Sequence, residues 1–317
     1  MIMFTEYRNG DIKMRERDKL EEQIREEIYD EGKEILERKT TINSITNEYI
    51  KANGLQKFYK YRTINEYSLK NIKNNTIWLS TADTFNDVYD GVFSFTDGNS
   101  IDEITRDMNT LIDELLKGKM HLVKKILKNA INKFTKDKEN SDILCEMYTA
   151  MVSRIIQSNQ SKTLVGSFCE NYNSIYMWGV YGDNGRGVCL EYDYNEIKNA
   201  IKNKEMKFYP VLYGRQYPKV RNLFWEYMHK CEAFETNYLA LMKSEEWKQE
   251  NEWRIIGKTN DCVGTNLNIK PSRIYFGPNI CKESIEKVLE VSEHKIECVQ
   301  LKKSLTDFTL DKGKIYE

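Results

Sequence analysis

The stretch from Lys57 to Gly91 constrains the fold most, because it combines two strand patterns, a short helix and a polar loop. Leu55–Tyr61 has the composition of a strand, and Ile77–Ser80 has that of a second, buried strand. Between them, Thr63 and Glu66 have the spacing of a capping box, which predicts a helix that begins at this point. A chain that opens its main domain in this way is expected to alternate short strands with helices.

The rest of the sequence extends this pattern. Further strands are expected at 164–169, 187–193, 207–214, 252–256, 273–277, 295–301 and over the last dozen residues, and helices at 11–38, 101–116, 117–138, 141–158, 175–181, 218–244 and 282–291. About seven or eight short strands with inserted helices predict an α+β fold with a mixed, mainly antiparallel sheet. We expect an N-terminal helical arm over 1–50 and a single α+β domain over 51–317, with a helical insertion at about 101–160.

The strand expected at 187–193 assigns its side chains to two faces. Val188, Leu190 and Tyr192 share one face, because side chains alternate along a strand. Cys189 and Glu191 then lie on the other face. Glu191 is therefore either at a solvent-exposed edge or in a functional site.

Composition limits the kind of protein. The 317 residues are 40% hydrophobic, enough for a sizeable core, and no apolar run reaches the roughly 18 residues that a membrane span needs. The N-terminus lacks the pattern of a secretory signal, so we expect a cytoplasmic protein without a membrane segment. Seven cysteines, an odd number and never spaced as CxxC, predict neither a disulfide framework nor a zinc ribbon. Three scattered histidines do not predict a metal site.

Two segments are candidates for partner contacts. The helix expected at 11–38 has a thin apolar stripe of Leu20, Ile24 and Ile28, which suits either a homo-oligomer contact or packing on its own domain. The segment 117–138 has eight lysines and one aspartate, a formal charge of +7. It is either a contact for nucleic acid or another anionic surface, or a solvated lysine face.

Polar residues gather directly after the second strand of the opening unit. They are Ser80, Thr81, Asp83, Thr84, Asn86, Asp87 and Asp90. Residues of these types are common in turns and helix caps. A dense polar cluster at the end of a buried strand is also a frequent location of functional sites.

Several short motifs together resemble a bacterial family known as domain of unknown function 2971, over about 57–301. They are Tyr59-Lys60-Tyr61-Arg62, Leu79-Ser80, Phe85-Asn86-Asp87, Met177-Trp178 with Tyr181 and Asp183, Gly187 with Leu190-Glu191-Tyr192-Asp193, Glu250-Asn251-Glu252-Trp253-Arg254, and Tyr275-Phe276-Gly277-Pro278. The resemblance implies no established activity.

A more distant resemblance is to the arginine-serine-glutamate class of ADP-ribosyltransferases. Arg62, Ser80 and the Glu250-Asn251-Glu252 turn follow one another in that family's order. The resemblance implies NAD as substrate, with Arg62 on its pyrophosphate and Ser80 supporting the carboxylate turn. Glu252, with Glu250, would stabilise the positive charge that develops as the nicotinamide–ribose bond breaks. A nucleic acid or protein would accept the ADP-ribose, unless water does.

The aromatic residues Tyr61, Trp178 and Tyr181 are candidates for stacking on the nicotinamide ring. A structural alternative is an ion pair between Arg62 and Glu252 on adjacent strands. Other candidate site residues are Asn86, Asp87, Asp90, Glu191 and Arg254.

Two other functions are consistent with the sequence. Asp87, Asp90, Glu191 and Glu252 are candidate ligands of Mg²⁺ in a metal-dependent nuclease, since this ion prefers oxygen ligands. The third interpretation is a non-catalytic binding or sensing module. Either the transferase or such a module would suit a bacterial system of phage defence or a toxin pair.

Overall fold

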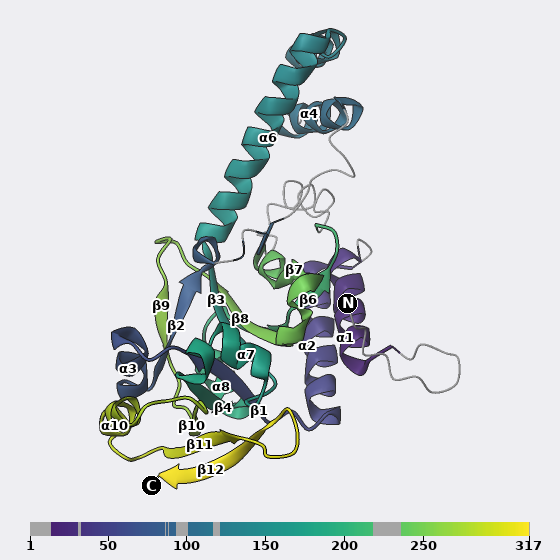
Figure 1. Ribbon diagram of the computed structural model, residues 1–317. Coiled ribbons are helices and arrows are strands. Elements are labelled where there is room, and N and C mark those ends of the chain that lie inside the picture. Colours follow the sequence, from purple (N-terminus) through teal and green to yellow (C-terminus); the bar gives the residue numbers. More distant parts are fainter. Residues whose placement is uncertain are drawn as a thin grey trace.

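The computed structural model describes residues 14–30, 33–85, 87, 89–92, 101–116, 121–217 and 236–316. It confirms the expected α+β fold, with a mainly antiparallel sheet covered by helices (Figure 1). None of the helices in these residues is long and apolar enough to cross a membrane.

The main sheet contains ten strands in the described part of the chain, in the order β12-β11-β10-β4-β1-β3-β2-β9, with β8 on β3 and β5 on β8. All its described pairs are antiparallel except β10 with β11. Its strands are β1 (Lys57–Arg62), β2 (Thr76–Thr81), β3 (Thr163–Cys169), β4 (Val188–Asp193), β5 (Lys207–Pro210), β8 (Glu252–Lys258), β9 (Thr265–Asn268), β10 (Arg273–Phe276), β11 (Glu297–Lys303) and β12 (Leu310–Tyr316). A separate parallel pair joins β6 (Leu212–Gly214) and β7 (Met242–Ser244).

The helices lie around the sheet and in one long projection. They are α1 (Glu16–Tyr29), α2 (Ile35–Ala52), α3 (Glu66–Lys73), α4 (Ile101–Leu115), α5 (His121–Phe134), α6 (Lys138–Ser161), α7 (Ile175–Val180), α8 (Tyr194–Ile201) and α10 (Lys282–Val291). Short 3₁₀ turns are η1 (Ala82–Thr84), η2 (Asp183–Gly185), η3 (Thr236–Leu241) and η4 (Glu245–Glu250).

A notch interrupts the sheet at one edge of β3. The other edge pairs with β8 along all seven residues of β3. At the notched edge, β2 pairs with Leu164 and Val165, and β1 pairs with Cys169 alone. Neither strand pairs with β3 between these points, at 166–168. Both β1 and β2 run antiparallel to β3, so the end of β1 and the middle of β2 face each other across the notch.

The two faces of the sheet have separate cores. Val188, Leu190 and Tyr192 pack in the larger core, whereas Cys189 belongs to the smaller one. The carboxylate of Glu191 accepts a hydrogen bond from Tyr275, another member of the smaller core. The alternation predicted for β4 is therefore confirmed.

The N-terminal helix α1 packs on the domain. Leu20, Ile24 and Ile28 are fully buried in the same core as the sheet. Helix α1 contacts β6, and α1 and α2 lie side by side at one flank of the molecule (Figure 1). The apolar stripe of α1 is therefore covered within its own domain.

The insertion forms a helical arm of α4, α5 and α6, in which α6 extends away from the sheet and leads directly into β3 (Figure 1). Lys124 and Lys128 of α5 form ion pairs with Asp113 of α4. Lys125 and Lys133 are exposed and have no acidic partner among the described residues. The lysine face predicted over 117–138 is thus partly neutralised, and its first four residues lie outside the described part.

Four local predictions were wrong. The segment 11–38 does not form one helix, because α1 ends at Tyr29 and α2 begins at Ile35. The capping box of α3 uses Asn65 and Ser68 in place of Thr63 and Glu66. The strand expected at 207–214 breaks at Val211 into β5 and β6. Of the helix expected at 218–244, the described end is the 3₁₀ turn η3 and the strand β7.

Candidate functional site

A cavity of about 380 Å³ opens at the notch and has a size typical of small-molecule sites. Strands β1, β2, β3, β7 and β8 contribute to its lining, as does the η1 region. The lining residues are Tyr59, Lys60, Tyr61, Arg62, Trp78, Ser80, Thr84, Phe85, Asp90, Val165, Ser167, Phe168, Met177, Tyr181, Lys243, Glu250, Glu252 and Arg254.

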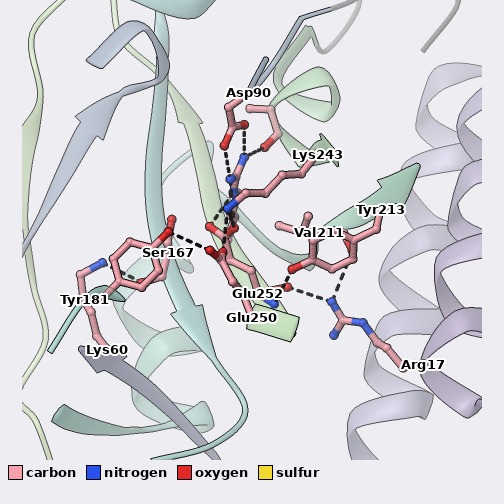
Figure 2. A network of polar contacts seen from close by, with 12 residues as sticks. Arg17, Lys60, Asp90, Ser167, Tyr181, Val211, Tyr213, Lys243, Glu250 and Glu252 are labelled. Carbon is pink, nitrogen blue, oxygen red and sulfur yellow. Dashed lines mark hydrogen bonds and ion pairs between the residues drawn. The ribbon is translucent and has the colours of Figure 1, made fainter. Parts of the chain in front are cut away.

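One part of the lining, here called the carboxylate wall, consists of Asp90, Lys243, Glu250, Glu252 and Arg254, and Figure 2 labels all of these except Arg254. Arg254 donates to both oxygens of Asp90, at 2.6 and 2.5 Å, and to both oxygens of Glu252, at 2.8 and 3.0 Å. Lys243 Nζ donates to Glu250 at 2.7 Å and to Glu252 at 2.9 Å. All five side chains are almost completely buried.

The turn that precedes β8 directs two carboxylates into the same cavity. Asn251 lies in the left-handed region, with φ 43° and ψ 51°, which Asn tolerates better than most residues. Glu250 and Glu252 flank it, and both line the cavity. The Glu-Asn-Glu sequence therefore suits the site in two ways. Asn251 adopts the left-handed conformation of the turn, and the two glutamates supply the carboxylates.

These two carboxylates differ in electrostatics. Burial, followed by repulsion from Glu252, raises the pKa of Glu250. Burial acts in the same direction on Glu252, but the charges of Arg254 and Lys243 and the hydrogen bonds from Arg254 and Ser167 outweigh it, so the pKa of Glu252 is lowered. The anionic form is thus favoured at Glu252, whereas Glu250 accepts a proton more readily.

The two carboxylates also differ in free acceptor capacity. A carboxylate has about four lone-pair positions. Glu252 accepts two hydrogen bonds from Arg254, one from Lys243 and one from Ser167, which fills it. Glu250 accepts from Lys243 and, at 2.7 Å, from the hydroxyl of Tyr181. Glu250 therefore retains lone pairs for a ligand.

A second part of the lining, here called the cationic wall, consists of Lys60 and Arg62 of β1. Lys60 is buried, and its ammonium group donates to the backbone carbonyl of Ser167 at 2.7 Å, across the notch. Neither Lys60 nor Arg62 forms an ion pair with an acidic side chain of the described residues, so the predicted Arg62–Glu252 pair is not formed. Burial lowers the pKa of both groups, most strongly that of Lys60.

Aromatic side chains complete the lining, and Arg254 lies 5.0 Å from the centre of the Phe85 ring. Tyr61 donates its hydroxyl proton to the carbonyl of Asn171 and lines the cavity. Tyr181 reaches the same cavity through its bond to Glu250. Aromatic rings can stack on a flat ligand, and seven charged side chains share the lining with them.

The structure brings most of the predicted site residues together in this cavity, namely Tyr61, Arg62, Ser80, Asp90, Tyr181, Glu250, Glu252 and Arg254. Trp178 is buried in the smaller core, with its indole N–H on the carbonyl of Tyr172, and does not line this cavity. Asp87 accepts from the amide of Tyr89 and is also not part of the lining. Asn86 lies outside the described residues.

Glu191 belongs to a different environment. It accepts hydrogen bonds from Ser272 at 2.9 Å and from Tyr275 at 2.8 Å, and Lys57 lies 3.6 Å away. It does not line the cavity. Two hydroxyls and the cations of Lys57 and Arg273, the latter 3.9 Å away, satisfy this carboxylate within the sheet.

The proposed magnesium ligands are therefore not gathered at one point. Asp90 and Glu252 are both engaged by Arg254, and Glu191 lies elsewhere. In the part of the chain that the structure describes, no group of three or more His, Cys, Asp or Glu side chains is placed to hold a metal ion.

Three of the polar residues at the site were not predicted. Lys60 shares a strand face with the buried Phe58, and this alternation was a usable signal of its burial. Lys243 lies in a segment that was expected to be helical, and its place depends on the pairing of β6 with β7. Arg17 of α1 reaches the Glu252 backbone from far away in the sequence.

Comparison with known proteins adds one finding. The profile of a family described as a protein of unknown function (DUF2971) matches residues 177–255. This stretch is similar to that family and includes Tyr181, Lys243 and the turn from Glu250 to Arg254, but neither β1 nor β2. No curated protein and no solved structure matches the chain.

Proposed function

We propose that the protein breaks the bond between nicotinamide and ribose in NAD, as an ADP-ribosyltransferase or an NAD glycohydrolase. The observation that carries this proposal is the cavity at the notch. There, Arg62 has no acidic partner among the described residues and shares the lining with Glu250 and Glu252, whose pKa values are shifted in opposite directions. A dinucleotide with an anionic pyrophosphate and a cationic ring complements both walls.

In the proposed reaction, nicotinamide leaves as a neutral base with the electron pair of the broken bond. Positive charge then develops on the ribose carbon and its ring oxygen. Glu252 supplies a fixed negative charge near this centre, and Arg254 and Lys243 hold it in place before substrate binds. Such preorganised charge lowers the barrier without rearrangement.

Glu250 is the better candidate for direct contact with substrate. Its free lone pairs allow it to accept a hydrogen bond from a ribose hydroxyl. Its raised pKa also suits it to take the proton of the attacking group, whether water or a macromolecule. With water, the products are nicotinamide, ADP-ribose and a proton.

The contacts on the phosphate side involve the cationic wall. The planar guanidinium of Arg62 suits two oxygens of a pyrophosphate, and the amine of Lys60 lies on the same strand face. A negatively charged acceptor of the ADP-ribose would also complement the exposed Lys125 and Lys133 on the arm.

The test is release of nicotinamide from NAD by the purified protein, together with NAD binding by calorimetry. We expect Glu250→Gln and Glu252→Gln each to reduce release by at least about 100-fold, since each removes a charge that acts in the transition state. Glu191→Gln is the matched control, because it neutralises a buried carboxylate outside the cavity. We expect it to retain release within about twofold.

Absence of both release and binding in the wild type would reject the proposal. Metal-dependent cleavage of phosphodiesters would then be measured with Mg²⁺, and partner capture would test a binding module. Equal loss in all three variants would show that the cavity has no special role.

A further inference from the structure

The turn that carries Glu250 and Glu252 is held from outside the sheet by α1. Arg17 of α1 is buried, and its Nη2 donates to the backbone carbonyl of Glu252 at 2.8 Å (Figure 2). The same nitrogen lies 3.3 Å from the carbonyl of Val211. A guanidinium group that bonds two carbonyls fixes the distance between the strands that bear them.

Arg17 is itself fixed by three further contacts. Its Nε donates to Glu21 at 2.9 Å, and its Nη1 donates to Glu170 at 2.8 Å. Its guanidinium carbon lies 4.9 Å from the centre of the Trp253 ring, the residue after Glu252. The indole N–H of Trp253 donates to the same oxygen of Glu170. Arg17 therefore has little freedom to move relative to β8.

Helix α1 also reaches the amide side of Glu252. The N–H of Glu252 donates to the hydroxyl of Tyr213 at 3.0 Å, and the N–H of Tyr213 donates to Glu21 at 3.3 Å. The carbonyl of Glu252 additionally accepts from the N–H of Val211 at 2.9 Å. Both peptide groups of Glu252 are thus tied, directly or through one residue, to α1.

We propose that Arg17 is a positioning residue, through which α1 fixes the orientation of the Glu250–Asn251–Glu252 turn in the cavity. This inference rests on the function proposed above. It extends the functional unit to a helix that lies more than 200 residues before the turn and outside the segment that matches the DUF2971 family. Helix α1 would then act on the cavity of its own chain.

The experiment compares Arg17→Lys and Arg17→Gln with Arg25→Lys and Arg25→Gln. Arg25 is a matched control, since it lies on the same helix and donates to a backbone carbonyl, that of Tyr213, at 2.8 Å. It contacts neither Glu252 nor the Tyr213 hydroxyl and N–H that link Glu252 to Glu21. Lysine keeps the charge beside Glu21 and Glu170 but cannot form all the bonds of the guanidinium. If Arg17→Gln does not fold, Arg17→Lys still tests the proposal.

We expect the Arg17 variants to lower kcat for nicotinamide release by about 10- to 100-fold, with Arg17→Lys the milder, because small misplacement of a catalytic group has effects of this size. KM for NAD should change less than about threefold, since Arg62 is untouched. The Arg25 variants should retain kcat within about twofold. Folded Arg17 variants with unchanged kcat, or equal losses in the Arg25 variants, would overturn the proposal.

Hydrogen–deuterium exchange separates this inference from the proposed function. In the Arg17 variants we expect faster exchange at the amides of Val211 and Glu252 than in the Arg25 variants, with global unfolding unchanged. This result is expected even if the wild type releases no nicotinamide, in which case only the proposed function fails. Equal exchange in both sets would reject the positioning role of Arg17.

Discussion

The two walls of the cavity each contain two buried or half-buried cations, but only one wall has anions of its own. Lys243 and Arg254 are paired with Asp90, Glu250 and Glu252, whereas Lys60 and Arg62 have no acidic partner among the described residues. In the first arrangement each cation has acidic partners, and Glu250 still has free acceptor capacity. The second leaves positive charge whose burial is costly, so a bound anion is the group that would complete it.

The largest expected effect concerns the carboxylate wall. Arg254→Met should lower the free energy of unfolding by about 3–5 kcal/mol, because it leaves the buried carboxylates of Asp90 and Glu252 without their shared partner. Urea unfolding followed by tryptophan fluorescence measures this. The double variant Asp90→Asn with Arg254→Met should recover part of the loss, and a loss below about 1 kcal/mol for Arg254→Met would show that the pairing matters little.

The next prediction contrasts Arg62 with Arg254. Arg62→Met should not destabilise the protein, since no acidic partner is lost, but it should weaken NAD binding by about 10- to 100-fold, the range for hydrogen bonds to a charged group. Calorimetry and urea unfolding test the two parts. If Arg62→Met destabilised the protein as much as Arg254→Met, the two walls would not differ in the way described.

The smallest effect is a pH dependence at Lys60. Burial lowers its pKa in the folded protein from the ordinary value of 10.5, so between the two values the unfolded chain binds more protons. Stability therefore rises with pH across that window, by at most about 1.4 kcal/mol per pH unit. The advantage of Lys60→Met over wild type should therefore shrink as the pH rises toward 10.5.

Urea unfolding at several pH values between about 7 and 9 measures this difference. Lys282→Met, at a largely exposed position, is the control and should show no such trend. A pH-independent difference between Lys60→Met and wild type would mean that Lys60 stays protonated in the folded protein.

Much of the fold was predictable because its signals are local. Alternation placed the side chains of β4 on their correct faces. Arg62, Ser80 and Glu252 were candidates from a resemblance, and their order along the chain did not tell that they line one cavity. Sequence alone did not reveal that β1 and β2 occupy the same edge of β3, because strand pairing is a long-range property. It placed Trp178 and Glu191 at the site, since local patterns do not tell which face of a sheet opens on a cavity.

The unpredicted residues have a common cause. Arg17 and Lys243 take their roles from contacts with chain segments that are distant or were expected to be helical. A charged residue that faces solvent from a helix has the same sequence pattern as a charged residue on the buried side of such a helix. Only the packing of α1 against β6 distinguishes them.

The arm has a mechanical consequence. The amide of Gln160, near the end of α6 that joins β3, donates to the carbonyl of Asp90 at 2.7 Å. With 24 residues, α6 is roughly 36 Å long, so a tilt of one degree about this end displaces the far end by roughly 0.6 Å. Helix α6 is therefore a long lever arm whose end next to β3 contacts Asp90 of the carboxylate wall. A displacement of the far end of α6 would therefore reach Asp90 through Gln160.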